Sequence, residues 1–172
     1  MTKKILILGV AIIMAFGLFA CGNKIPFNAV VLSDGYNFKT KFLNENRTYG
    51  ARYLNENYNE DEDEWSDRYL VDETSPIFRV FVIKEQAELD KAFVYFPQID
   101  FDKNMILVYC YTEIYSRSQI INSIELDGTV LEVEFSLKKA KPGVGDASAP
   151  QTRFMIIKMD LLAITEVTFI KK

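Results

Sequence analysis

The sequence predicts an α+β domain built mainly of an antiparallel β-sheet, with one amphipathic helix at about residues 84–96. Two observations predict this fold class. Between residues 77 and 170, short runs of β-branched and aromatic residues alternate with turn-forming residues, as they do in antiparallel sheets. The segment 84–96 instead has apolar residues at helical spacing, with acidic residues early, which is typical of an amphipathic helix.

Residues 1–20 have the pattern of a secretory signal peptide. Two lysines precede an apolar run that is shorter than the roughly 20 residues of a membrane-spanning helix. The junction Leu18-Phe19-Ala20-Cys21 resembles the lipobox of bacterial lipoproteins, in which the cysteine is acylated and becomes the new N-terminus. This resemblance implies that residues 21–28 are a lipid-anchored tether and that the protein lies on the extracytoplasmic face of the cell membrane. An uncleaved N-terminal anchor helix is the alternative.

Composition excludes several classes of function. The 172 residues contain no histidine, which excludes Ser-His-Asp and Cys-His nucleophile systems and His-ligated zinc catalysis. Without residues 1–20 the chain has 18 basic and 24 acidic residues, a net charge of −6, which argues against nucleic-acid binding. We therefore expect a protein that is not an enzyme and that carries no cofactor and no metal.

Residues 29–172 are predicted to form a single domain. Short apolar stretches at 29–32 and 36–40 flank a Ser-Asp-Gly turn signal and predict weak strands. Residues 56–73 then carry nine acidic residues and one basic residue, Arg68, a composition typical of a solvated, mobile loop.

The acidic loop contains the only tryptophan, Trp65. Two interpretations stay open: the ring pins the loop to the domain, which we favour, or it is an exposed contact for a partner. The asparagines and aspartates of residues 57–63 have the spacing of a calcium loop. However, Glu62 occupies the position of the turn glycine, and Arg68 that of the closing glutamate. The loop therefore does not fit a calcium site, although a Ca²⁺-binding or small-ligand-binding lipoprotein is an alternative function.

Turn signals and apolar patterns predict the remaining elements. The helix ends at Pro97, and Asp127-Gly128 is a favoured two-residue hairpin turn. Cys110 lies in an apolar run, so we expect an inert, buried thiol. Alternation of apolar residues with Glu132 and Glu134 predicts a half-buried strand. The predicted strands are 77–83, 105–112, 119–126, 129–137, 154–159 and 166–170.

Several motifs of residues 76–172 follow the order of a known domain family. A strand and helix are followed by the turn Asp100-Phe101-Asp102 feeding a central strand, then a hairpin, a loop with Pro142-Gly143, and a last strand pair at 153–158 and 165–170. In this order the segment resembles the domain family named for the protease-complex subunit PrcB. The resemblance implies a partner-binding accessory domain, with an envelope protein such as a protease or its complex as partner.

The polar loop after residue 137 is the predicted partner-binding surface. Loops held by a rigid sheet often carry binding residues, and glycines allow close approach of a partner's backbone. Lysines on an otherwise acidic protein could meet an acidic partner or anionic lipid headgroups. A plain solvated connection between strands is the alternative. The predicted residues are Lys138, Lys139, Lys141, Pro142, Gly143, Gly145, Asp146 and Arg153.

The main functional expectation is a non-catalytic, lipid-anchored interaction or accessory module at the cell envelope. A carboxylate-based hydrolase using Asp100 and Asp102 is the enzymatic alternative, because paired carboxylates suit glycoside hydrolysis. That alternative requires a concave pocket that contains both side chains and a raised carboxyl pKa.

Overall fold

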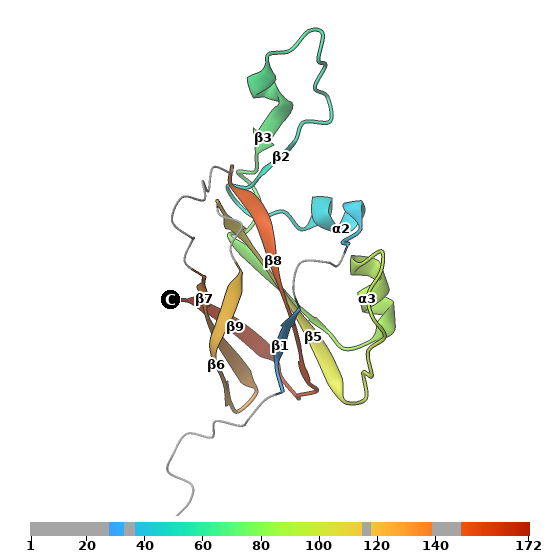
Figure 1. Ribbon diagram of the computed structural model, residues 1–172, viewed down its shortest axis with the longest axis vertical. Helices are drawn as coiled ribbons and strands as arrows, with labels where there is room; N and C mark the ends of the chain where they lie inside the picture. The colour runs from blue at the N-terminus through green and yellow to red at the C-terminus, as the bar shows by residue number, and fades with distance from the viewer. Residues whose placement is uncertain (1–27, 33–36, 115–117, 139–148) are drawn as a thin grey trace, which may run out of the picture.

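The computed structural model describes residues 28–32, 37–114, 118–138 and 149–172, and it confirms the α+β, mainly antiparallel fold class. Helices cover one face of a four-stranded sheet, and a three-stranded sheet covers the other (Figure 1). The elements are β1 (Val30–Leu32), α2 (Thr40–Glu45), β2 (Arg52–Leu54), the 3₁₀ helix η1 (Trp65–Arg68), β3 (Tyr69–Val71), β4 (Phe78–Ile83), α3 (Gln86–Ala92), β5 (Asn104–Glu113), β6 (Gln119–Asp127), β7 (Val130–Leu137), β8 (Gln151–Asp160) and β9 (Glu166–Lys171).

The four-stranded sheet has the order β1-β8-β5-β4, and all its pairs are antiparallel. Strand β5 is buried on both faces, which explains its uninterrupted apolar run. Successive side chains of a strand point to opposite faces. Leu107 and Tyr109 therefore pack toward the second sheet, whereas Val108 and Cys110 pack toward the helices.

The second sheet has the order β6-β7-β9 and lies across the first. Leu131, Val133 and Phe135 on β7 are fully buried, and the glutamates between them are only partly buried, so the predicted half-buried strand is confirmed. Strand β9 runs parallel to β7. The expected pairing of the last two strands is wrong, because β8 pairs with β5 while β9 extends the other sheet, where Phe169 covers the core.

The hairpin turn between β6 and β7 lies one residue later than expected. Asp127 pairs with Val130, so Gly128 and Thr129 are the two central residues. Gly128 has a φ of 59°, and Thr129 has no positive φ. A positive φ at the first central position alone is the pattern of a type II′ turn, which favours glycine there.

The helical layer differs most from the sequence prediction. Helix α3 ends at Ala92 rather than near Pro97, because the chain beyond it is extended and forms hydrogen bonds with residues 37–39. The Lys39 N–H donates to Ala92 O (2.9 Å), and the Val94 N–H donates to Asn37 O (2.7 Å). The strand expected at 36–40 is reduced to a single bridge between Phe38 and Phe93. Helix α2 follows at once, and its Phe42 stacks on Phe38, the two ring centroids being 5.4 Å apart.

Candidate functional site

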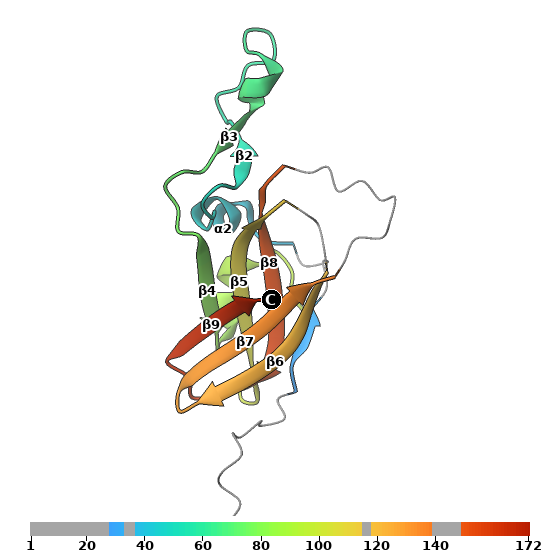
Figure 2. The same ribbon diagram turned by 90° about the vertical axis from the view of Figure 1, so that its left-hand side faces the viewer.

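Residues 52–71, which we call the arm, project from the body of the protein (Figures 1 and 2). Strands β2 and β3 pair antiparallel, from Arg52 opposite Val71 to Leu54 opposite Tyr69. The acidic residues lie on the tip of this hairpin and on η1. The segment 56–73 was expected to be a solvated, mobile loop. Residues 56–64 form a loop that is exposed except at Tyr58, but η1 and β3 follow it, and β3 pairs with residues before the acidic run.

Trp65 does not pin the arm to the body. Its side chain is 66% exposed, and its aromatic contact is with Arg68 of the same short helix, whose guanidinium carbon lies 4.6 Å from the ring centroid. Residues three apart are eclipsed in a 3₁₀ helix, so this stack is a local contact. The interpretation that we favoured from the sequence is therefore wrong, and an exposed aromatic surface remains.

Trp65 is one of several exposed apolar residues on the arm. A two-stranded hairpin has no second layer against which to bury side chains. Leu54 is 54% exposed, and every residue of β3 is exposed. Isolated exposed apolar residues are ordinary, but a group of them on one projecting element marks an interaction site. The exposed apolar side chains of the arm are Leu54, Trp65, Tyr69, Leu70 and Val71.

The base of the arm is fixed by buried polar contacts. Thr48 is fully buried, and its hydroxyl lies 2.8 Å from that of Thr112 on β5. The Asp72 carboxylate accepts hydrogen bonds from the Ser75 N–H (2.8 Å) and hydroxyl (2.9 Å) and from the Thr74 N–H (3.0 Å). Burial tends to raise the pKa of Asp72, but these hydrogen bonds and the positive charge of Arg47 lower it below its usual value.

The arm and the start of the described chain lie at opposite ends of β8. Arg52 N–H at the base of the arm donates to Pro150 O (2.7 Å), just before β8 begins. Asn28 N–H donates to the carboxylate of Asp160 (3.3 Å), where β8 ends. A ten-residue strand spans about 33 Å. The arm therefore points away from the end at which the N-terminal segment enters the domain (Figure 1).

The predicted lysine-rich surface is described only at its margins. Lys138 is exposed at the end of β7, and its N–H donates to Ser118 O (2.9 Å). Arg153 is partly buried on β8, and its Nε is buried without a hydrogen-bond partner among the residues that the structure describes. The other predicted residues lie outside the described residues, and so does Cys21. They are Lys139, Lys141, Pro142, Gly143, Gly145 and Asp146.

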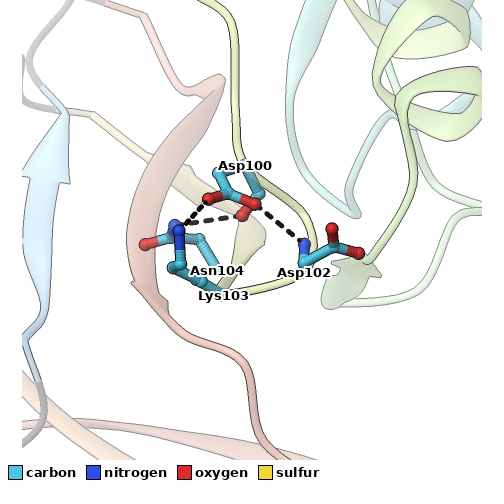
Figure 3. A network of polar contacts seen from close by, with 4 residues as sticks. All are labelled: Asp100, Asp102, Lys103 and Asn104. Carbon is cyan, nitrogen blue, oxygen red and sulfur yellow. Dashed lines mark hydrogen bonds and ion pairs between the residues drawn. The ribbon is translucent and has the colours of Figure 1, made fainter.

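Asp100 and Asp102 lie in one turn, which is held by hydrogen bonds to Asp100 (Figure 3). The Asp100 carboxylate lies 2.7 Å from Lys103 Nζ and accepts a hydrogen bond from the Asp102 N–H (3.2 Å). The hydrogen bond from Lys103 lowers the pKa of Asp100. Both carboxylates line an open hollow. A general acid needs a raised pKa, which Asp100 does not have.

The buried cysteine and the acidic side chains of the described residues are the other candidate groups. Cys110 is fully buried, as expected, and burial raises its pKa to about 12, so its thiol stays protonated. Within the described ranges, no three acidic or cysteine side chains converge so that they could hold a metal ion. No helix of those same ranges has the length and apolar character to cross a membrane.

A groove of about 670 Å³ lies beside the sheet, between α2, α3 and β4. The sequence did not predict this groove. It exists because β4 is an edge strand, and the order of strands in a sheet cannot be deduced from local sequence. The sequence predicted the strand 77–83, but no local pattern shows which segments lie beside that strand. The lining residues are Lys39, Lys41, Phe42, Glu45, Val80, Phe81, Val82, Ile83, Glu88, Lys91 and Ala92.

Comparisons of the chain with protein-family models, with curated proteins and with solved structures found no match. The likeness to the PrcB-like domain family therefore stays a prediction from motifs.

Proposed function

We propose that this protein is a non-catalytic lipoprotein, anchored through Cys21 to the extracytoplasmic face of a bacterial membrane, whose arm binds a partner protein of the cell envelope. The observation that carries the proposal is the exposure of Trp65 and its apolar neighbours on an element that projects from the body. Tryptophan and arginine are enriched among residues that dominate binding energy. The arm presents both, stacked on each other.

The geometry of the body supports this role for the arm. An acylated Cys21 would be seven residues from Asn28, so the lower end of β8 would lie near the membrane. The base of the arm is at the other end of the same strand. The apolar surface of the arm would then face outward, where another envelope protein can reach it.

The chemistry of the arm favours a basic, partly apolar partner surface. Acidic residues flank Trp65 in the sequence, and complementary charge accelerates encounter and disfavours unsuitable partners. The apolar side chains would supply most of the affinity once water is excluded. A protease or its complex, as the resemblance of residues 76–172 implies, is the first class of partner to examine.

Site-specific photocrosslinking tests the arm. A benzoylphenylalanine replaces Trp65 in the full chain in native membranes, and in a matched control it replaces Tyr95, which is 71% exposed beyond α3. We expect a discrete protein adduct from position 65 and none of the same mass from position 95. Identical adducts from both positions, or none from position 65, would contradict the arm as the binding surface.

Two further variants separate the anchor from the binding surface. Cys21→Ala is expected to move the protein from the membrane fraction to the soluble fraction. The triple change of Lys138, Lys139 and Lys141 to Glu is expected to leave the position-65 adduct intact. Loss of the adduct in the triple variant would instead make the lysine-rich loop part of the binding surface.

A further inference from the structure

Strand β4 has an open edge. The sheet order places it last, and its one neighbour among the described strands is β5. In an antiparallel edge strand, alternate residues direct their N–H and C=O groups away from the sheet. The six residues Phe78–Ile83 include no proline and one charged residue, Arg79. Natural proteins usually protect such an edge with charges, prolines or a covering element.

The groove follows this open edge. Its floor combines the four residues 80–83 of β4 with Phe42 of α2 and Ala92 of α3. Phe42 also packs against Phe81, with ring centroids 5.3 Å apart, so the α2 wall is attached to the strand. A cavity of about 670 Å³ is large enough for several side chains. An apolar channel beside free strand hydrogen-bonding groups is the geometry that accepts an extended peptide.

The rim of the groove carries three lysines and two glutamates. Lys41 lies 3.7 Å from Glu45, and Glu88 accepts a hydrogen bond from the Lys84 N–H (3.1 Å). Lys39 donates to the carbonyl of Asp90. Lys91 is exposed and has no hydrogen bond or ion pair with any residue that the structure describes. A carboxylate of a bound segment would therefore pair with Lys91, at the α3 side of the groove.

We propose that the groove binds an extended acidic segment of another protein, which adds a strand to the free edge of β4. Alternate apolar side chains of the segment would occupy the channel between α2 and α3, and a carboxylate would pair with Lys91. A folded second copy fits less well. Its own β4 is flanked by α2 and α3, and edge-to-edge pairing would bring those helices against the same helices of the first copy.

This inference does not depend on the arm or on the lipid anchor. The groove is lined by α2, α3 and β4, and none of its lining residues belongs to residues 52–71. Failure of one proposal therefore leaves the other standing, and Trp65→Ala is expected to leave peptide binding unchanged.

Fluorescence polarisation with three labelled peptides tests the proposal on the detergent-solubilised full chain. The probe EVTVTVE alternates apolar and polar residues and ends in carboxylates, and KVTVTVK reverses its charges. The third probe is EVTVTVE with a methyl group on every backbone nitrogen, so that it has no N–H group to donate to a strand. We expect saturable binding of EVTVTVE, at least about tenfold weaker binding of KVTVTVK, and none of the N-methylated peptide. Equal binding of the N-methylated peptide, or no binding of EVTVTVE below about 1 mM, overturns the proposal.

Two charge reversals locate the site. Lys91→Glu is expected to weaken binding of EVTVTVE about tenfold, which corresponds to about 1.4 kcal/mol. Lys103→Glu is the matched control, because it makes the same change in net charge on an exposed lysine outside the groove. An equal loss in both variants overturns the groove as the site. So does a concentration-dependent dimer, observed by sedimentation, that excludes the peptide, because the occupant is then a second copy.

Discussion

At the scale of single residues, the arm is held by a few buried polar atoms. Asp72 is 8% exposed, and its carboxylate accepts four hydrogen bonds, from the N–H and hydroxyl groups of Thr74 and Ser75. Its own N–H and C=O pair with Ala51 and Gly50 across the base of the arm. Gly50 has a φ of 79°, a conformation that side chains disfavour. These contacts fix the direction of the arm relative to the body.

Asp72→Asn is expected to lower the free energy of unfolding by about 1–3 kcal/mol at pH 7, because it removes charge-assisted hydrogen bonds from a buried site. The pKa of Asp72 is lowered in the folded protein, so the stabilisation is present above its ordinary value of 3.8 and is lost as the pH falls through and below that value. Urea unfolding at pH 7 and at pH 3 measures the difference.

Asp102→Asn is the control for that experiment, since Asp102 is exposed and its variant is expected to stay within about 0.5 kcal/mol of the parent. An equal loss for Asp72→Asn at both pH values would mean that the carboxylate charge does not stabilise the base of the arm.

The two cysteines should respond differently to a thiol reagent. Burial keeps Cys110 protonated and inaccessible, so we expect no reaction in the folded protein. In denaturant, the chain isolated from membranes should show one thiol, because an acylated Cys21 is a thioether. Two thiols would mean that Cys21 is unmodified. Cys21→Ala should show one thiol and calibrates the assay.

At the scale of elements, the arm and the body have separate sources of stability. The body buries β5 and β8 between two layers, whereas the described tip of the arm, beyond its buried base, consists largely of exposed residues. The arm already closes on itself beyond β2, where the Asn55 N–H donates to Arg68 O (3.0 Å).

Replacing residues 56–67 by Asn-Gly should therefore leave the body folded. The expected change in the free energy of unfolding is within about 0.5 kcal/mol, because the excised residues are nearly all exposed and a shorter loop costs less entropy to close. Thermal unfolding followed by circular dichroism measures it. A loss of several kcal/mol would show that the tip of the arm packs on the body.

At the scale of the whole molecule, two sheets share one core, and β9 completes it. Phe169 on β9 stacks on Tyr109 of β5, the ring centroids being 4.3 Å apart and the planes 9° apart. Phe135 on β7 meets Tyr109 edge-on at 5.7 Å. The last strand of the chain is thereby joined to the centre of the first sheet.

Phe169→Ala is expected to cost about 3 kcal/mol, the lower end of the range for aromatic truncation, because the ring is only partly buried. Thr168→Ala on the other face of β9 should cost less than about 1 kcal/mol. Equilibrium unfolding in urea compares the two variants. Similar small losses would mean that β9 is not an integral part of the core.

The candidate sites were only partly predictable from the sequence. Trp65 could be singled out as a solitary tryptophan in an acidic segment, but its exposure depends on where the hairpin points. The groove could not be found, because its α2 wall, residues 39–45, lies more than thirty residues before its β4 floor in the chain. The hollow at Asp100 is the opposite case, since a turn within five residues determines its hydrogen bonds.

Local pattern by itself determined the fold class and the strands of the two larger sheets, because the alternation of Glu132 and Glu134 with buried residues and the apolar run of β5 reflect burial residue by residue. Tertiary structure alone decided which strands pair. Strand β5 joins β8 across some forty residues, β9 lies parallel to β7, and α3 stops where residues 37–39 bond to its end. Such pairings depend on contacts between distant segments, which no local pattern specifies, and they set both the open edge of β4 and the direction of the arm.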